Sequence, residues 1–261
     1  MASSQQSKFE RFKELHERPG AFVIPNPWDT GTARILASLG FEALATTSAG
    51  YGFAIGKGSS QATFSRAEIL HNAREIVEAT DLPVSADLEE GFGDRPEDCA
   101  ETINQAIQTG LVGGSIEDAT GNPDAPLYEF ELAVERVAAA CEASSDQLFL
   151  MTARAENYLH GVADLEDTIK RLQAFSKAGA DVLYAPGLPD LETIKIVCDA
   201  VDKPVNVVMG LSGPSYSVDE LDAAGVKRIS VGGSFARAAL AGLVNAATEV
   251  KEKGTFRYAQ N

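Results

Sequence analysis

The chain has 261 residues, a length that suits one large domain with a substantial hydrophobic core. Its 38 aspartates and glutamates outnumber its 22 lysines and arginines, and the formal net charge of -16 disfavours binding to nucleic acid or to an anionic membrane. No apolar run approaches the roughly 20 residues of a membrane span, and the polar N-terminal segment lacks the apolar stretch of a signal peptide. We therefore expect a cytoplasmic protein without a membrane partner.

Taken in chain order, short apolar runs alternate with amphipathic runs of helical period. The first segment predicts a short helix around residues 5 to 17. The predicted strands are then "FVIPN", "EALATTS", "PVSADLE", "GGSIED", "LFLMTARAE", "DVLYAPG", "PVNVVMG" and "KRISVGG". A helical run follows each of them, from "TARILASLG" after the first strand to "SFARAALAGLVNAATEVKEKG" after the last. The chain thus contains eight strand–helix units.

Glycines separate these units at matching places, because each of four helical runs ends on a glycine one or two residues before a strand: Gly40, Gly110, Gly179 and Gly225. No linker rich in proline, serine or charge interrupts the units. The pattern predicts a single (β/α)8 barrel domain over residues 1–261, preceded by the short helix. An open doubly wound sheet is the alternative, but "PNPWDTGTA" after the first strand is not a glycine-rich dinucleotide loop.

Acidic residues gather at the predicted C-terminal ends of strands three and four, where barrel enzymes carry their active sites. Asp87 and Glu89 share one side of strand three, and Glu117 ends strand four. Three carboxylates converging there would repel one another unless a hard divalent cation, Mg2+ or Mn2+, neutralised them. Glu90 and Asp118 alternate away from the interior, so we interpret them as solvated loop charges or helix N-caps.

Arg154 ends the apolar run "FLMTAR", where a cation has no packing role. Its planar guanidinium suits a substrate carboxylate or phosphate in an otherwise acidic protein. An internal ion pair with Glu117 or Glu156 is the alternative, and the two roles can coexist. After strand two, "TTSAG" offers a hydroxyl and successive backbone N–H groups as an anion site, or else a turn chosen for packing. At the end of strand seven, Asn206 is a further candidate for substrate binding.

Four motifs on successive strands resemble the isocitrate lyase/phosphoenolpyruvate mutase superfamily. "ADLEEGFG" is similar to its Asp-x-Asp-x-Gly-[Phe/Tyr]-Gly metal motif, with Glu89 in place of the second aspartate. "SIEDATG", "TARAE" and "TTSAG" resemble its Ile-Glu-Asp segment, its Ala-Arg-Thr-Asp-like segment and its substrate-binding Ser-Gly turn. The similarity runs from "PNPWDTGTARILASLGFEAL" to "SVGGSFARAAL", which is nearly the whole chain.

The resemblance implies a Mg2+-dependent barrel that makes or breaks C–C or P–C bonds of small oxo acids through an enolate. By position, the metal would be held, directly or through water, by Asp87, Glu89 and Glu117. The substrate carboxylate would be bound by the turn that comprises Thr47, Ser48, Ala49 and Gly50. Arg154 would bind substrate oxygens, and Asn122 would belong to the gating loop after strand four. We therefore predict that Arg154, Ser48 and Asn122 take part in catalysis.

Departures from the superfamily narrow the reaction. The lyase loop with its acid/base cysteine is replaced by "EDATGNPDAPLYEFE", and a glutamate expected near the end of strand six is replaced by "YAPG". Ser60 or a neighbour stands where mutases carry a catalytic aspartate. These changes favour decarboxylation or C–C cleavage of a small 2-oxo or 2-hydroxy (di)carboxylic acid over P–C chemistry. A phosphonopyruvate-type mutase or hydrolase and a non-catalytic barrel that binds an oxo acid are the alternatives.

Two other barrel chemistries and the quaternary structure complete the expectations. A Schiff-base aldolase is disfavoured, because no lysine takes an inward strand position near the mouth. A phosphate site at "VGGS", before the last helix, is a rival, although close packing explains those glycines as well. We expect a homo-oligomer, a dimer or a tetramer; relatives commonly exchange a C-terminal helix, for which "EVKEKGTFRYAQN" is short.

Overall fold

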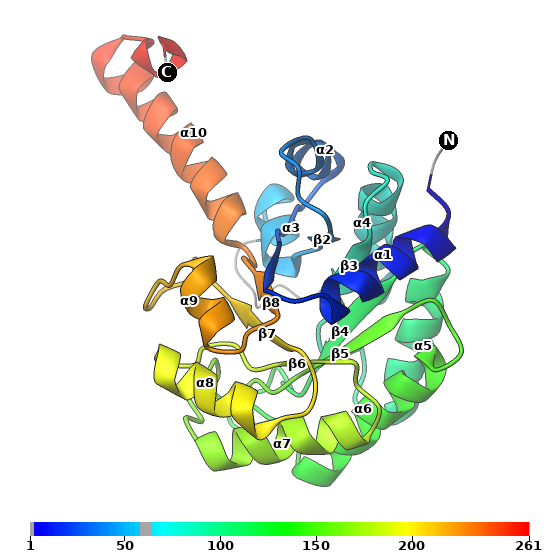
Figure 1. The fold of residues 1–261 in the computed structure, drawn as a ribbon. Coiled ribbons are helices and arrows are strands. Elements are labelled where there is room, and N and C mark those ends of the chain that lie inside the picture. Colours follow the sequence, from blue (N-terminus) through cyan, green and yellow to red (C-terminus); the bar gives the residue numbers. More distant parts are fainter. Residues whose placement is uncertain (1–2, 58–63, 261) are drawn as a thin grey trace.

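The computed structural model describes residues 3–57 and 64–260. Eight parallel strands form one sheet that curls into a nearly closed barrel, in the order β1-β8-β7-β6-β5-β4-β3-β2 (Figure 1). The strands are β1 (Phe22–Ile24), β2 (Leu44–Ala45), β3 (Val84–Asp87), β4 (Gly113–Glu117), β5 (Leu150–Arg154), β6 (Val182–Tyr184), β7 (Val205–Val208) and β8 (Arg228–Ser230). Between β1 and β2, the amide N of Ala45 donates to the carbonyl O of Pro25 at 3.0 Å. The predicted (β/α)8 fold is confirmed.

Each predicted helical run is a helix, and most of these helices surround the barrel (Figure 1). The helices are α1 (Gln5–Glu17), α2 (Thr30–Ser38), α3 (Ser48–Ala54), α4 (Arg66–Glu78), α5 (Pro96–Ile107), α6 (Phe130–Ser144), α7 (Leu165–Lys177), α8 (Leu191–Ala200), α9 (Val218–Ala223), α10 (Ser234–Lys253) and the 3-10 helix η1 (Arg257–Gln260). The sequence reading did not predict α3 or η1.

Local sequence signals set the helix boundaries. Asp29 and Ser65 cap α2 and α4, because each side chain accepts a hydrogen bond from a backbone N–H of the first turn. The four predicted helix-ending glycines all have positive φ, for example 111° at Gly179, a conformation that favours glycine. The chain therefore turns from helix to strand where the sequence predicts it.

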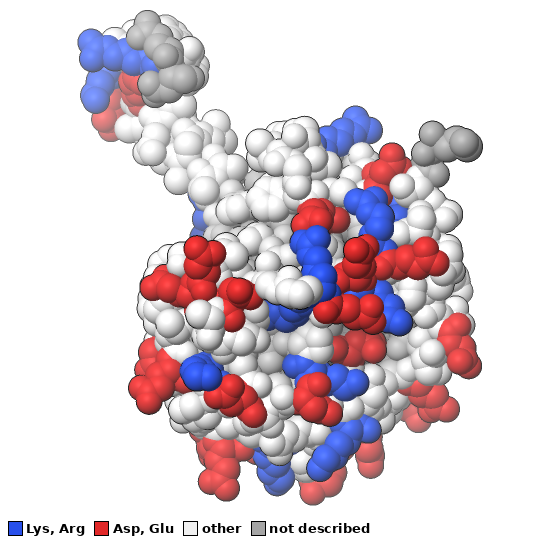
Figure 2. Space-filling model, in the orientation of Figure 1, with Lys and Arg blue, Asp and Glu red and all other residues white. Residues whose placement is uncertain are grey.

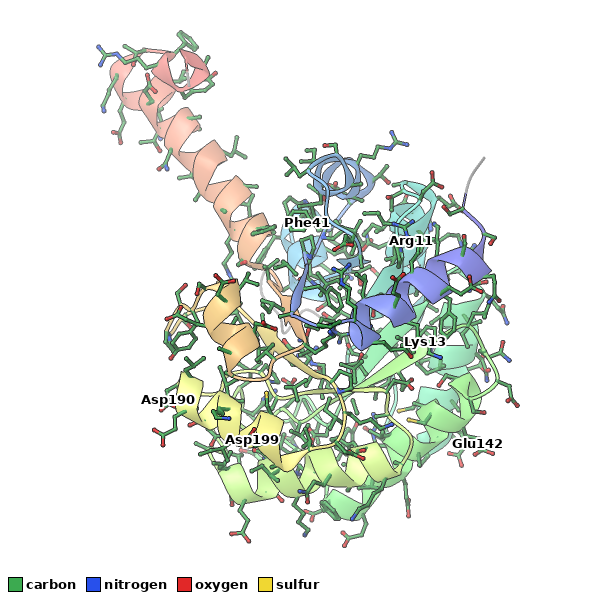
Figure 3. All side chains as sticks on the ribbon, in the orientation of Figure 1. Arg11, Lys13, Phe41, Glu142, Asp190 and Asp199 are labelled. Carbon is green, nitrogen blue, oxygen red and sulfur yellow. The ribbon has the colours of Figure 1, made fainter. Side chains whose placement is uncertain are left out.

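Two apolar regions hold the barrel together. The larger lies between the sheet and the surrounding helices, and the smaller closes the N-terminal end of the barrel, where α1 packs Phe12 and Leu15 against Phe22. Charged side chains such as Glu142, Asp190 and Asp199 point outward (Figure 3). Because α1 closes the N-terminal end of the barrel, the C-terminal ends of the strands form the only open end among the described residues. Barrel enzymes carry their active sites at that end.

His16 of α1 is buried at the N-terminal end of the barrel, and its ionisation should make the stability of the fold depend on pH. Its Nδ1 donates to the carbonyl O of Phe12 at 2.7 Å, and its Nε2 lies 3.4 Å from Nη1 of Arg228. Burial, and then the charge of Arg228, lower the pKa of His16 to about 3, against about 6.5 in the unfolded chain. The unfolded state thus binds an extra proton, so the stability from neutral His16 is complete above pH 6.5 and is lost as the pH falls toward 3.

We expect His16→Gln, which has an amide that does not titrate, to reduce this acid destabilisation. The effect on the free energy of unfolding is up to about 5 kcal/mol over the whole window. Urea denaturation of wild type and variant at pH 7 and pH 4.5 measures it, as the change in their stability difference between the two pH values. Equal pH dependence in the two proteins would show that His16 does not titrate on unfolding.

Helix α10 leaves the barrel instead of lying along it (Figure 1). Of its described residues only Ala236 is buried, and Leu243 and Val244 are 64% and 61% exposed. In the space-filling view, most of the length of α10 is uncharged, and charged side chains gather at the end of the helix that lies far from the barrel (Figure 2). No helix among residues 3–57 and 64–260 is both long and apolar enough to cross a membrane.

Candidate active site

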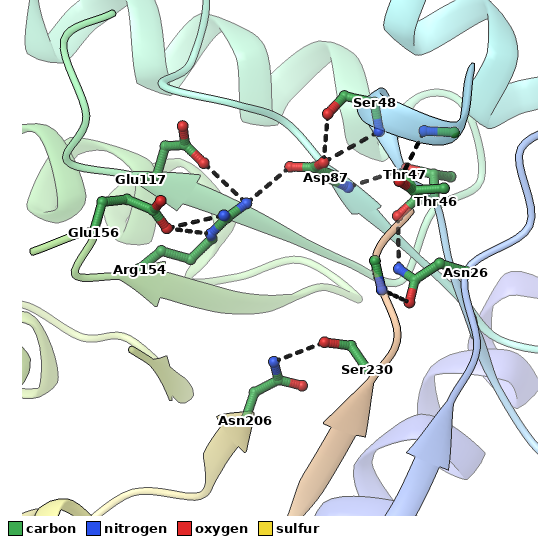
Figure 4. Close-up of polar contacts among 12 residues, drawn as sticks. Asn26, Thr46, Thr47, Ser48, Asp87, Glu117, Arg154, Glu156, Asn206 and Ser230 are labelled. Carbon is green, nitrogen blue, oxygen red and sulfur yellow. Dashed lines mark hydrogen bonds and ion pairs between the residues drawn. The ribbon is translucent and has the colours of Figure 1, made fainter. Parts of the chain in front are cut away.

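Three strand ends bring together charged residues that the sequence singled out. Asp87, Glu117 and Arg154 are the last residues of β3, β4 and β5, which are neighbours in the sheet. Nη1 of Arg154 lies 3.1 Å from Oδ1 of Asp87 and 2.9 Å from Oε2 of Glu117 (Figure 4). The barrel mouth therefore carries a compact cluster of opposite charges.

Glu156 completes this cluster from the connection after β5. Its Oε1 accepts hydrogen bonds from Nε of Arg154 and lies 2.9 Å from Nη2 (Figure 4). The ion pairs with Glu117 and Glu156 that we considered for Arg154 are present. Burial opposes the positive charge of Arg154, but the Glu117 carboxylate and its neighbours outweigh it and raise the arginine pKa. The ring of Tyr184, a contact that the sequence reading missed, lies 4.9 Å from the guanidinium carbon.

The "TTSAG" turn lies against Asp87. The backbone N and the Oγ of Ser48 both donate to Oδ2 of Asp87, at 3.2 and 2.8 Å, and Thr47 caps the short helix α3 by accepting from the N of Gly50 (Figure 4). A Cβ on Gly50 would lie 2.6 Å from Cγ2 of Thr47 and 3.2 Å from Cβ of Trp28, so only glycine fits. Packing thus explains Gly50, while Ser48 faces the cluster.

Asn26, two residues after the end of β1, supports this turn from the point where β1 and β2 close the barrel. The sequence did not predict this role. Its Nδ2 donates to the carbonyl O of Thr46, and its Oδ1 accepts from the backbone N of Val231 and of Gly232 (Figure 4). One buried amide therefore ties the first, second and eighth strand ends together. In the sequence, only the position of Asn26 directly after "FVIP", at the end of a predicted strand, could have indicated this role. The sequence does not show which strands lie beside it.

Residues 89–93 follow β3 as a strained loop. Glu89 and Phe92 have φ of 52° and 60°, a left-handed conformation that costs free energy in residues other than glycine. The buried Arg136 of α6 holds the loop, since its Nη1 donates to the carbonyl O of Gly93 at 2.7 Å and its Nη2 to that of Glu90. Helix α6 thus fixes the position from which Glu89 extends.

Burial makes this group of carboxyls difficult to ionise together. The pKa of Glu89 is raised to about 8, first by burial and then by the charge of Asp87. Burial also raises the pKa of Glu117 well above its usual value, although Arg154 acts in the opposite direction. A single guanidinium leaves the carboxyls in excess, which is the condition under which a further cation would bind.

The chemistry of these donors fits a hard divalent cation, whose preferred ligands are carboxylate oxygens and water. Among residues 3–57 and 64–260, no three His, Cys, Asp or Glu side chains are arranged closely enough to enclose an ion as they stand. The guanidinium of Arg154 instead lies among Asp87, Glu117 and Glu156. Asp87, Glu89 and Glu117 would hold Mg2+ directly or through water, and this assignment stays a prediction.

Asp118 corrects one interpretation from the sequence, because it is neither solvated nor a helix cap. Only 2% exposed, it accepts from the backbone N of Glu156 at 2.8 Å and pairs with Nη1 of Arg171 at 3.1 Å. It does alternate away from the barrel interior, as the pattern indicated. However, Arg171 of α7 fills the space between helix and sheet there, and the sequence alone does not show such a partner.

Two other candidate residues lie apart from the carboxyl cluster. Asn122 is at the exposed end of the hairpin after β4, where its Oδ1 accepts from the N of Asp124. Asn206 is 1% exposed inside the barrel, between Ser230 and Arg228, and is hydrogen-bonded to both. A catalytic role for Asn122 and a substrate contact for Asn206 stay predictions, and Ser60 lies outside the described residues.

Known proteins resemble this chain over most of its length. A solved structure from Burkholderia cenocepacia J2315, described only as a lyase/mutase, is 57% identical with a TM-score of 0.95, covering 98% of this chain and 92% of its own. Oxaloacetate decarboxylase of Pseudomonas putida GB-1 is 29% identical over 84% of this chain and 75% of its own length. 2-Methylisocitrate lyase of Escherichia coli K12 is 30% identical over 61% of this chain, a match that spans 56% of that protein.

The phosphoenolpyruvate phosphomutase family model matches residues 12–251. This range includes every strand of the barrel and the residues of the carboxyl cluster, namely Asp87, Glu89, Glu117 and Glu156 with Arg154. The chain therefore belongs to the phosphoenolpyruvate phosphomutase family, and through it to the isocitrate lyase/phosphoenolpyruvate mutase superfamily.

Proposed function

We propose that the protein is a Mg2+-dependent lyase that cleaves a C–C bond of, or decarboxylates, a small 2-oxo or 2-hydroxy (di)carboxylic acid. The observation that carries the proposal is the position of Arg154 among three carboxyl groups, Asp87, Glu117 and Glu156, at the barrel mouth. The relatives support it, because a decarboxylase of oxaloacetate and a C–C lyase are among them.

The residues of the cluster would divide the work. Bound Mg2+ would supply Lewis-acid stabilisation of the developing enolate oxygen. Arg154 would donate its planar N–H groups to substrate oxygens, and Ser48 would donate its backbone N–H and hydroxyl to the substrate carboxylate. Both residues now donate to Asp87, so binding would exchange one carboxylate partner for another without burying unpaired donors.

The hairpin after β4 indicates which reactions are favoured. Between Asp118 and Tyr128 it contains no histidine, cysteine or lysine that could protonate a carbanion. Decarboxylation and retro-aldol cleavage need a stabilised enolate more than they need a strong acid at this position. P–C bond chemistry is the second candidate, because the matching family model is that of a phosphomutase.

A turnover assay tests the proposal. Purified protein with Mg2+ is incubated with oxaloacetate, 2-hydroxy dicarboxylic acids and phosphonopyruvate, and pyruvate or another oxo-acid product and free phosphate are measured. Formation of an oxo acid from a carboxylic substrate supports the lyase, and phosphate release or rearrangement of phosphonopyruvate supports the second candidate. Tight binding of these acids without turnover of any of them would support a binding protein and contradict both.

We also propose that the protein is a cytoplasmic homo-oligomer whose interface includes α10. This helix carries its exposed apolar residues away from its own barrel (Figures 1 and 2). Ile35 of α2 and Leu39, the residue directly after α2, are likewise 58% and 69% exposed. Because α10 does not cover the outside of its own barrel next to α2, a second copy's α10 is the occupant that we assign to this surface.

We expect the double variant Leu243→Asp, Val244→Asp to be a monomer, because the added charges would be buried in the interface. Sedimentation velocity of wild type and variant measures the change in mass. The control is Lys251→Asp, near the charged end of α10, which should keep the wild-type mass. An unchanged mass in the folded double variant would remove α10 from the interface.

A further inference from the structure

The loop of residues 89–93 carries one of the expected metal ligands in an unfavourable backbone conformation. Glu89 itself has φ of 52°, and Phe92 has φ of 60°. Residues other than glycine keep such a conformation only where the surrounding structure imposes it. The position from which the Glu89 carboxyl extends therefore depends on the contacts that hold this loop.

Side chains from two neighbouring helices bind the backbone carbonyls of the loop. Thr102 of α5 donates from Oγ1 to the carbonyl O of Gly91 at 2.6 Å. Arg136 of α6 donates from Nη1 to the carbonyl O of Gly93 at 2.7 Å and from Nη2 to that of Glu90. A single guanidinium thus spans the loop from Glu90 to Gly93.

Arg136 is a buried cation that pairs with no carboxylate in the described part of the chain. It is 1% exposed, both of its hydrogen bonds go to loop carbonyls, and its Nε has no partner among these residues. Burying an unpaired charge costs free energy, and an apolar side chain would fill the same space without that cost. Packing alone therefore does not explain an arginine here, whereas its contacts with the loop do.

The ring of Tyr128 keeps the guanidinium in one orientation. The guanidinium carbon of Arg136 lies 4.0 Å from the centroid of this ring. The phenol of Tyr128 donates to Oδ1 of Asp94, the residue directly after the loop, at 2.7 Å. A planar cation held against an aromatic face loses little freedom when it binds, so both N–H groups stay directed at the loop.

We propose that Arg136 is a positioning residue for the metal site, and that its hold on residues 89–93 makes this site selective for Mg2+ over Ca2+. The inference rests on the proposed function, because Glu89 must be a metal ligand. Mg2+ requires near-octahedral geometry at about 2.1 Å, whereas Ca2+ accepts variable geometry at about 2.4 Å. A loop that holds its ligand rigidly favours the smaller ion, and a loosened loop discriminates less between the two.

Titration calorimetry of the full-length chain with MgCl2 and with CaCl2 tests this role. Arg136→Lys keeps the charge but offers one nitrogen where the guanidinium uses two. We expect it to lower Mg2+ affinity by about tenfold or more and Ca2+ affinity by much less, so that the preference for Mg2+ falls. Thr102→Val, which removes the hydrogen bond to Gly91, should change the preference in the same direction.

The control is Phe175→Leu, which alters a fully buried core residue of α7. It should lower the melting temperature and leave the ratio of Mg2+ to Ca2+ affinity as in the wild type. A loss of stability without an effect on the loop is thereby separated from a change in the metal site.

Each outcome decides the assignment. A lower ratio of Mg2+ to Ca2+ affinity that is confined to the two loop variants supports it. An unchanged ratio in folded Arg136→Lys, or an equal fall in Phe175→Leu, overturns the positioning role and leaves the proposed function standing. If Arg136→Lys does not fold, Thr102→Val decides by the same criterion. Failure of the wild type to bind Mg2+ overturns the proposed function as well.

Discussion

Asp87→Ala should abolish measurable binding of Mg2+ and, with it, binding of oxalate. The Asp87 carboxylate is the point where Ser48 and Arg154 meet, and it ends β3 beside Glu89. Altering residues that merely support metal ligands typically costs 10- to 100-fold in affinity, so removing a ligand should cost on the order of 100-fold or more. Titration calorimetry with Mg2+, alone and with oxalate, measures both losses.

The fold should survive this change, because Arg154 keeps Glu117 and Glu156 as partners. The matched control is Glu90→Gln in the same loop, whose side chain is only partly buried and is not among the cluster residues. It should bind Mg2+ like the wild type. Unchanged Mg2+ affinity in folded Asp87→Ala would show that these carboxylates serve only to neutralise Arg154.

Arg154→Lys should lower oxalate affinity or turnover by roughly ten- to a thousandfold, about 1.4 to 4 kcal/mol. The lysine keeps the charge but cannot contact Asp87, Glu117 and Glu156 at once, as the guanidinium does. Arg154→Ala should also lose about 3 to 5 kcal/mol of stability, because it leaves buried carboxyls without their cation. Thermal melting and oxalate titration of both variants separate the two effects.

Arg171 provides the control for this experiment. It too is a buried arginine between two carboxylates, Asp118 and Asp167, but it lies behind the sheet. Arg171→Lys should lower the melting temperature and leave oxalate affinity near that of the wild type. If Arg154→Lys behaved in the same way, Arg154 would be a structural ion-pair residue, and much of the case for an anionic substrate would be lost.

The sequence predicted the barrel and the carboxyl cluster because both depend on local patterns. Strand and helix periods gave all eight units, and parallel strands bring their C-terminal ends to one mouth, so Asp87, Glu117 and Arg154 had to be neighbours. It did not predict partners that come from distant segments. The burial of Asp118 depends on Arg171, and the role of Asn26 depends on the eighth strand. The direction of α10 depends on tertiary contacts, which helical periodicity does not encode.

The central claim is that Asp87, Glu89 and Glu117 hold a divalent cation and that an oxo acid binds to this cation. A crystal of the protein grown with Mn2+ and oxalate tests it most directly, since anomalous scattering locates the ion. We expect one Mn2+ per chain, bound directly or through water by Asp87, Glu89 and Glu117, with oxalate between the ion and Arg154. Oxalate at Arg154 without Mn2+, or Mn2+ bound only elsewhere on the chain, would contradict this account.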